Sequence, residues 1–140
     1  MIEASGCIFL STKTGRILLQ LRSSNVTHSK TWGFFGGKSE EDERPVETLR
    51  REIKEEIGMM PDIIKTIPIS KFTSINGRFI YNSFVVLVDD EFVPILNGES
   101  DGYAWVDIGK WPKPLHPGAK IKCKSKDFLK KIKTIYDLHR

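Results

Sequence analysis

The chain has 140 residues, of which 39% are hydrophobic and 29% charged, and its formal net charge is +4 at neutral pH. These values fit one globular domain spanning residues 1–140 and exclude disordered and fibrous classes of protein. No apolar run approaches the ~20 residues that cross a bilayer, and the N-terminus lacks the layout of a signal peptide. We therefore expect a cytoplasmic protein without a membrane partner.

The N-terminal half begins with a predicted β-hairpin. Apolar runs at residues 4–11 and 17–21 flank a turn-forming stretch, Lys13-Thr14-Gly15. Further along, residues 32–37 (WGFFGG) combine aromatic side chains with glycines just before an acidic stretch. We interpret residues 32–37 as a functional loop.

The clearest helix is predicted at residues 45–57. Pro45 suits the first turn of a helix, and Gly58 suits the position that ends it. Apolar side chains recur at spacings of three and four residues, as expected for one buried face: Val46, Leu49, Ile53 and Ile57.

Four strands are predicted after this helix. Two long strands, at residues 67–75 and 78–88, meet at Asn76-Gly77, which is a strong signal for a tight hairpin turn. Shorter strands at residues 91–96 and 103–108 bracket a polar loop that contains Glu99.

The last predicted element is a helix at residues 125–138, with Ser125 as its N-cap and an apolar stripe along one face. Lysines dominate residues 110–140, a feature that nucleic-acid-binding tails share. They flank the apolar stripe without interleaved aromatic residues, so we favour a solvated helix face and expect no nucleic-acid partner. The order of elements predicts an α/β fold in which helices cover a mixed β-sheet.

Three carboxylates share one face of the helix at residues 45–57. Glu52, Glu55 and Glu56 fall within an arc of about 100°, next to the apolar stripe. Like charges this close repel, so we expect a cation on this face, and Mg²⁺ at a polyphosphate site uses such ligands. The alternative is a solvated face with ordinary pairs from Arg51 to Glu47 and to Glu55.

The larger pattern resembles the Nudix hydrolase signature. That signature is a glycine, five residues, a glutamate, seven residues, Arg-Glu, an aliphatic residue, any residue, Glu-Glu, any residue, a glycine and an aliphatic residue. The chain matches every position, with methionine in the final aliphatic place: Gly37, Glu43, Arg51, Glu52, Ile53, Glu55, Glu56, Gly58 and Met59.

The resemblance implies a Nudix-type α/β/α sandwich with a mixed β-sheet and a Mg²⁺ cofactor, for which Mn²⁺ can substitute. It implies metal ligands at Glu52, Glu55, Glu56 and the Gly36 carbonyl. Glu55 and Arg51 are also expected to be catalytic, with Arg51 orienting the carboxylates through Glu43. The remaining signature positions have structural roles: Gly37, Glu43 and Gly58.

The resemblance extends to substrate-binding residues outside the signature. Arg22 lies where related enzymes often place an arginine that contacts phosphate, and Lys38 follows the glycine pair as in many members. Phe34 and Tyr81 are candidates for stacking on a nucleobase, although aromatic residues in strands more often pack in the core. His28 and His116 have no partner at a diagnostic spacing and are interpreted as loop histidines.

The sequence offers a candidate for the general base, but its identity stays open. Nudix enzymes often recruit a glutamate outside the signature, and Glu99 lies in a loop that resembles the one they use. The alternative is a simple turn residue, with Asp101 as an equally acidic neighbour.

The function implied is Mg²⁺-dependent hydrolysis of the phosphoanhydride in a nucleoside diphosphate linked to another group. The substrate would be a small nucleotide: a nucleoside triphosphate, ADP-ribose, a dinucleoside polyphosphate or similar. The alternative is a catalytically silent Nudix scaffold that senses nucleotides or binds RNA. The sequence is compatible with a homodimer.

Overall fold

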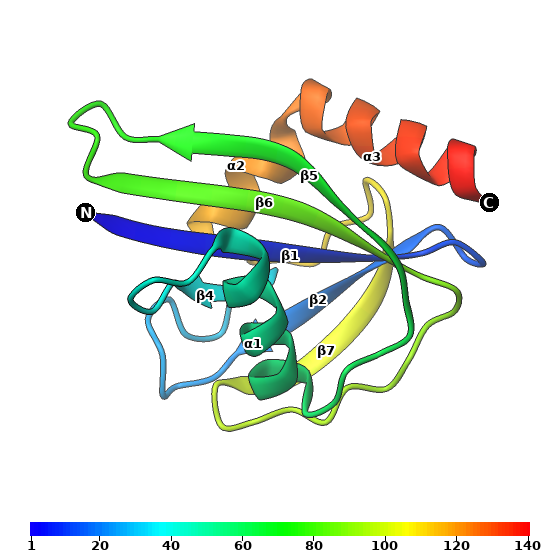
Figure 1. The fold of residues 1–140 in the computed structure, drawn as a ribbon. Helices are drawn as coiled ribbons and strands as arrows, with labels where there is room; N and C mark the ends of the chain where they lie inside the picture. The colour runs from blue at the N-terminus through cyan, green and yellow to red at the C-terminus, as the bar shows by residue number, and fades with distance from the viewer.

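The computed structural model describes residues 1–140 and places helices on both sides of a seven-stranded sheet (Figure 1). This confirms the predicted α/β fold. The elements in chain order are β1 (Ile2–Ser11), β2 (Arg16–Arg22), β3 (Trp32–Gly33), β4 (Phe35–Lys38), α1 (Pro45–Ile57), β5 (Ile63–Thr73), β6 (Phe79–Val88), β7 (Ser100–Asp107), α2 (Pro117–Lys124) and α3 (Lys126–His139).

The sheet is mixed. Its main path runs β3-β2-β1-β6-β5, while β4 pairs with β1 and β7 pairs with β2. Only the β1–β6 pair is parallel, and the other pairs are antiparallel. The β1–β2 hairpin is paired at Leu10 and Ile17, beyond which the two strands separate, and β4 pairs with the N-terminal half of β1.

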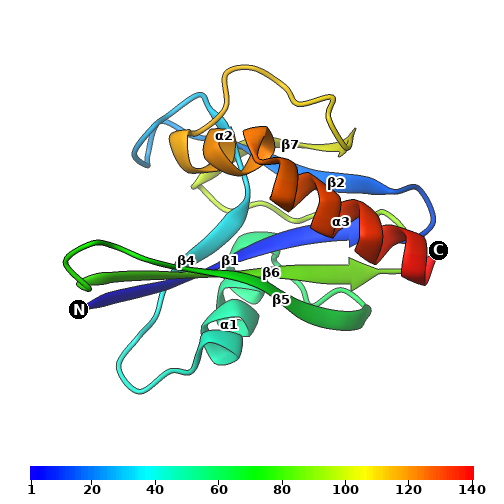
Figure 2. The same ribbon diagram turned by 90° about the horizontal axis from the view of Figure 1, so that it is seen from above.

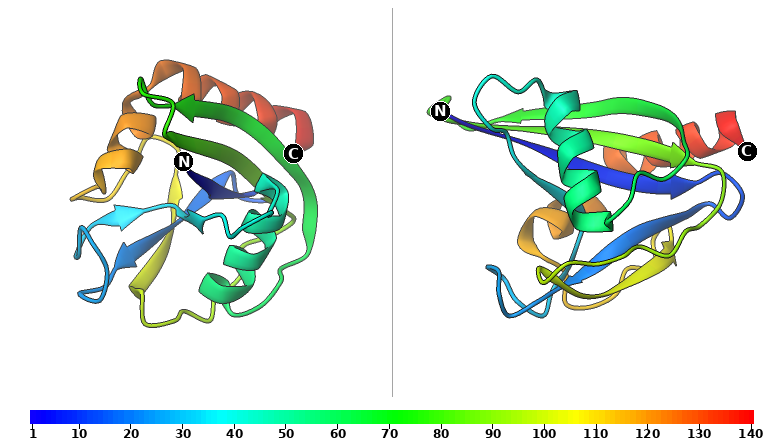
Figure 3. Two further views of the ribbon diagram at one scale, coloured as in Figure 1. Left: turned by 60° about the vertical axis from the view of Figure 1, so that its left-hand side comes forward. Right: turned by 60° about the horizontal axis from the view of Figure 1, so that its bottom comes forward.

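Two apolar cores lie on opposite faces of the sheet (Figure 2). Alternate residues of β1 and β6 point to opposite faces, so Phe9 and Val86 pack against α1 while Ile8 and Val85 pack against α3. The views in Figure 3 place α1 on one side of the strands and α2 and α3 on the other. None of the helices is both long and apolar enough to span a membrane.

The prediction of a loop at residues 32–37 was wrong, because this segment forms β3 and β4. Gly36 has a φ of +145°, and a Cβ there would collide with the carbonyl oxygen of Ser5 in β1. The glycine pair therefore lets β4 lie against β1. The residue pattern of this segment has no strand periodicity, so the pairing could not be predicted from it.

The prediction of a strand at residues 91–96 was also wrong. Pro94 has no N–H to donate to a sheet, and the other backbone groups find partners elsewhere. The N–H of Ile95 donates to the carbonyl of Ile57 (2.7 Å), and the carbonyl of Phe92 accepts from the indole of Trp105 (3.0 Å). The segment is irregular chain that packs Phe92 and Leu96 against the α1 core and leaves Val93 and Ile95 exposed.

The C-terminal region differs from the prediction in one element. Ser125 caps α3 as predicted, because its hydroxyl accepts from the N–H of Phe128 (3.2 Å). The helix α2 was not predicted, since its eight residues, beginning at Pro117, carry few apolar positions. Its N-cap is His116, whose ring accepts from the N–H of Gly118 (3.0 Å).

Candidate active site

Helix α1 begins and ends as its sequence predicts. Pro45 is its first residue, and Gly58 ends it in the left-handed conformation, with a φ of 76°. A Cβ at Gly58 would lie 2.6 Å from the carbonyl oxygen of Ile95. Glycine is therefore required there both for its backbone angle and for the close approach of the next segment.

The glycine pair of β4 contacts two carboxylates of α1. The N–H of Gly36 donates to Oε1 of Glu56 (2.9 Å), and a Cβ at Gly37 would overlap the carboxylate of Glu52. The backbone of β4 therefore lies directly against the acidic face of the helix.

Glu56 is a buried carboxylate, only 3% exposed. Burial raises its pKa to about 9, and the nearby charges of Glu52 and Glu99 raise the pKa further. The hydrogen bond from Gly36 opposes this shift by lowering the pKa. Its second oxygen accepts from the side-chain amide of Gln20 (3.4 Å). Burial also raises the pKa of Glu52, although Arg51 opposes that shift.

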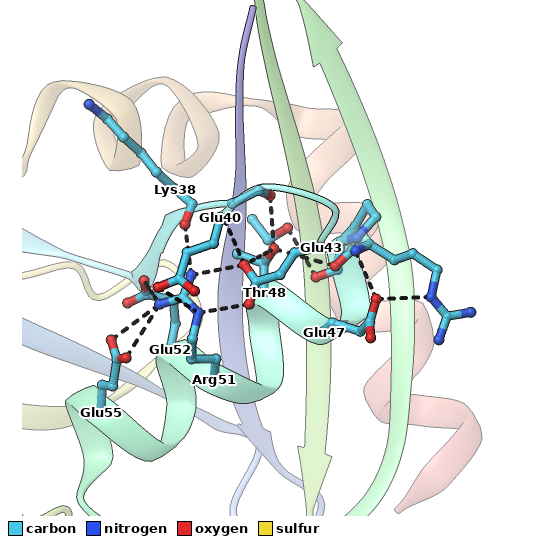
Figure 4. A network of polar contacts seen from close by, with 12 residues as sticks. Lys38, Glu40, Glu43, Glu47, Thr48, Arg51, Glu52 and Glu55 are labelled. Atoms are coloured by element: carbon cyan, nitrogen blue, oxygen red, sulfur yellow. Dashed lines mark hydrogen bonds and ion pairs between the residues drawn. The ribbon is translucent and has the colours of Figure 1, made fainter.

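Arg51 is the centre of an ion-pair network (Figure 4). It donates two hydrogen bonds to Glu43 (2.7 and 3.0 Å) and one to Glu52 (2.9 Å). It also reaches Glu55 (3.3 Å) and the carbonyl of Lys38 (2.9 Å). Hydrogen bonding to Arg51 lowers the pKa of Glu43 to about 2. The predicted link between Arg51 and Glu43 thus exists, and it ties α1 to the loop after β4.

The carboxylates predicted as metal ligands share one patch without converging on one point. Glu52 and Glu55 turn toward Arg51, whereas Glu56 turns toward β4. The donor set suits a hard divalent cation, because it consists of carboxylates beside backbone that lacks side-chain bulk. The buried carboxylate of Glu56 forms no ion pair of its own, which further fits a cation here. The role of the Gly36 carbonyl stays a prediction.

The predicted substrate residues lie at the ends of neighbouring strands. Arg22 ends β2, and its guanidinium donates to the carbonyl (2.8 Å) and hydroxyl (3.2 Å) of Thr27. The side chain of Lys38 is exposed and points away from the Arg51 network (Figure 4). Phe34 lies against Phe128 of α3, with ring centroids 6.1 Å apart. Their roles stay predictions.

Tyr81 lies over Gly6 of β1, where a Cβ would overlap its hydroxyl. The ammonium of Lys122 on α2 lies 4.9 Å from its ring centroid. Burial raises the pKa of Tyr81 to about 12. One face of this ring is therefore covered by Lys122, which was not foreseen because α2 was not predicted.

Glu99 lies in the loop before β7, close to the end of α1. The side chain of Asn97 in that loop donates to the carbonyl of Glu55 (2.9 Å) and accepts from the N–H of Glu99 (2.9 Å). The carboxylate of Asp101 instead pairs with Lys30 (3.0 Å). Glu99 in the loop and Asp101, the second residue of β7, are thus in different surroundings.

Gln20 belongs to the site and was not singled out from the sequence. Its amide nitrogen donates to the carbonyl of Phe34 (3.1 Å) and to Glu56 (3.4 Å), and its oxygen accepts from the hydroxyl of Ser100. A signal was present, because a lone amide in the apolar strand ILLQL must find hydrogen-bond partners when buried.

The mixed sheet, the covering helices and the signature on α1 define a Nudix-type α/β hydrolase domain. The family model described as the NUDIX domain matches residues 2–123, so the chain belongs to the Nudix family. Among solved structures, a Nudix hydrolase from M. smegmatis, RenU, superposes with a TM-score of 0.70 at 18% identity, covering 99% of this chain and 86% of that one.

Two curated relatives are similar to the chain. A CTP pyrophosphohydrolase of Escherichia coli is 33% identical over 81 residues, which is 58% of each chain. The mRNA-decapping enzyme subunit 2 of Saccharomyces cerevisiae is 33% identical over 120 residues, which is 82% of this chain and 12% of that protein. The chain therefore corresponds to only part of each of these relatives.

Proposed function

We propose that the chain is a Mg²⁺-dependent pyrophosphohydrolase that cleaves the phosphoanhydride of a nucleoside diphosphate linked to another group. The observation that supports this most is the contact of the buried carboxylate of Glu56 and the half-buried carboxylate of Glu52 with the Gly36-Gly37 backbone. Such a patch gains from a divalent cation and from the phosphate oxygens that complete its coordination.

Glu52, Glu55 and Glu56 would hold the metal, with the Gly36 carbonyl as a further oxygen ligand. When bound, Mg²⁺ would activate a water and neutralise phosphate charge at this patch. Arg51 would keep Glu52 and Glu55 oriented, because its guanidinium is already held by the two hydrogen bonds that it donates to Glu43. Arg22 would bind substrate phosphate through the part of its guanidinium that Thr27 leaves free.

The substrate is proposed to be a small nucleotide. One relative is named a CTP pyrophosphohydrolase and another an mRNA-decapping enzyme, so both nucleotides and capped RNA belong in the test. A phosphate-release screen with nucleoside triphosphates, ADP-ribose, dinucleoside polyphosphates and capped RNA, each with and without Mg²⁺, tests the proposal. Turnover of none of them would favour the silent scaffold.

Magnesium at low millimolar concentration is expected to raise the melting temperature. A cation that binds the native carboxylates and not the unfolded chain stabilises the fold by mass action. Thermal unfolding with Mg²⁺ and with EDTA measures this. The control is Glu56→Gln, in which the response should be smaller, and an unchanged melting temperature in the intact protein would contradict the metal site.

Glu99 is proposed as the general base or an extra metal ligand, so Glu99→Gln is expected to lower turnover by at least ~10-fold. The matched control is Asp101→Asn, since Asp101 lies two residues further along, at the start of β7, with its carboxylate already paired to Lys30. Turnover at saturating Mg²⁺ is measured across pH for both. A loss confined to Asp101→Asn, or no loss in either, would remove Glu99 from the mechanism.

A further inference from the structure

Three cationic or titratable side chains from distant parts of the chain meet beside β3. They are Arg22 at the end of β2, His28 in the following loop and His116 at the start of α2. The rings of the two histidines pack edge to face, with centroids 4.9 Å apart. A Cβ on Gly33 would lie 3.3 Å from Cβ of His116 and 3.9 Å from Cδ of Arg22, so both flank this glycine.

The backbone holds this Arg22–His28–His116 cluster in place. The N–H of His116 donates to the carbonyl of Trp32 (2.8 Å), and that of Trp32 donates to the carbonyl of Pro114 (2.9 Å). The carbonyl of His28 accepts from the hydroxyl of Thr31 (2.6 Å). The side chains are therefore positioned before any ligand arrives, which lowers the cost of ordering them.

The cluster has hydrogen-bond donors that are not used by an acidic side chain. Nδ1 of His116 accepts from Gly118, which leaves the Nε2 proton for another partner. The guanidinium of Arg22 uses two nitrogens on Thr27 and has one to spare. None of the three side chains forms an ion pair, and the carboxylate of Asp101 at the start of β7 is paired with Lys30.

The cluster lies next to the acidic face of α1. Gln20, which donates to Glu56, is two residues before Arg22 on the same strand. Gly33, which lies between Arg22 and His116, is three residues before Gly36. At ~3.3 Å per extended residue, the two glycines are at most about 10 Å apart. One polyphosphate chain can therefore reach both places.

We propose that His28 and His116 form, with Arg22, a subsite for a phosphate of the substrate remote from the α1 carboxylates, and that it favours nucleotides with three or more linked phosphates. The inference rests on the proposed function and narrows its substrate. A nucleoside diphosphate sugar would place an uncharged sugar in this subsite and gain little there. A phosphate oxygen would accept from the guanidinium and from both Nε2 groups.

The neutral form of His116 is the one that fits this subsite. Burial, together with the charges of Arg22 and His28, lowers the pKa of His116 and so favours the neutral ring. In that form Nδ1 can accept from the N–H of Gly118 while Nε2 donates to a phosphate oxygen, whereas an imidazolium has no lone pair with which to accept.

The test uses His116→Asn, because asparagine retains an N-cap oxygen for α2 while removing the imidazole. A second variant, His28→Asn, removes the other imidazole. Each single variant is expected to raise the Michaelis constant for a nucleoside triphosphate about tenfold, which is the effect of losing one charge-assisted hydrogen bond, and to change turnover little. The constant for ADP-ribose stays unchanged. The control is His139→Asn on α3, whose ring is hydrogen-bonded to the carbonyl of Ile135 and lies outside the cluster.

A binding measurement separates this proposal from the proposed function. Inorganic tripolyphosphate is titrated calorimetrically into metal-free protein in EDTA, where it should bind the wild type and bind His116→Asn about tenfold more weakly. Equal binding by both, or equal Michaelis constants for the triphosphate, overturns the subsite. Absence of Mg²⁺-dependent turnover in the wild type overturns the function alone.

Discussion

Replacing Glu56 with glutamine is expected to lower turnover at least ~10²-fold and to leave the fold intact. The carboxylate is proposed as a metal ligand, so its charge acts on the transition state more than on packing. Glutamine has nearly the same shape and still accepts from Gly36. Steady-state kinetics and circular dichroism measure the two effects, and near-normal turnover would assign the chemistry to other residues.

The same variant has a second expected property, which comes from the raised pKa. Folding lifts the pKa of Glu56 from 4.5 to about 9, so between these values the native state binds more protons than the unfolded chain. The contribution of Glu56 to stability is present below pH ~4.5 and is lost as the pH rises toward ~9. In the absence of metal, the melting temperature of Glu56→Gln at pH 8 should therefore be no lower than that of the wild type. It should be higher if the cost of burying the Glu56 charge exceeds the stability gained from its hydrogen bonds.

Removing the positive charge of Arg51 is expected to have the largest effect on stability. Arg51→Met leaves Glu43 and Glu52, whose side chains are 16% and 15% exposed, without their cationic partner. Breaking such a network should lower the melting temperature by roughly 5–10 °C and reduce turnover through misplaced carboxylates.

The control for this effect is the adjacent residue on the same helix. Arg50→Met removes the same charge and adds the same side chain, but Arg50 is exposed and forms no ion pair. Hydrogen bonding holds the pKa of Glu43 near 2, so its contribution is present above pH ~4.5 and is lost as the pH falls toward ~2. The gap between the two variants should shrink over that range, and equal melting temperatures at neutral pH would contradict the network.

Elements with local signals were predictable from the sequence. Helix α1 was placed residue by residue, because its period, its Pro45 and its Gly58 all act within the helix itself. The hairpin turn at Asn76-Gly77 was placed for the same reason, although β5 begins at Ile63, earlier than predicted. Glu43, Arg51 and the three carboxylates came from one continuous stretch with fixed spacing.

Elements that depend on distant partners were not predictable. The strand β4 exists because β1 and β2 separate and leave backbone groups of β1 to pair, which residues 32–37 do not encode alone. The segment at 91–96 has the composition of a strand, but its backbone donates to the carbonyl of Ile57 and accepts from the indole of Trp105 and not from a neighbouring strand. The meeting of His28 with His116 likewise needs α2 beside β3, and neither histidine signals the other by spacing.

The two groups that hold Glu56 both lie outside the signature. The amide of Gly36 is 20 positions away in the chain and that of Gln20 is 36 positions away, on two different strands. A peptide of residues 37–59 contains every signature residue and neither of these groups. The signature is therefore not self-sufficient: the helix can form locally, but Glu56 is held in its orientation only where β2 and β4 lie beside it.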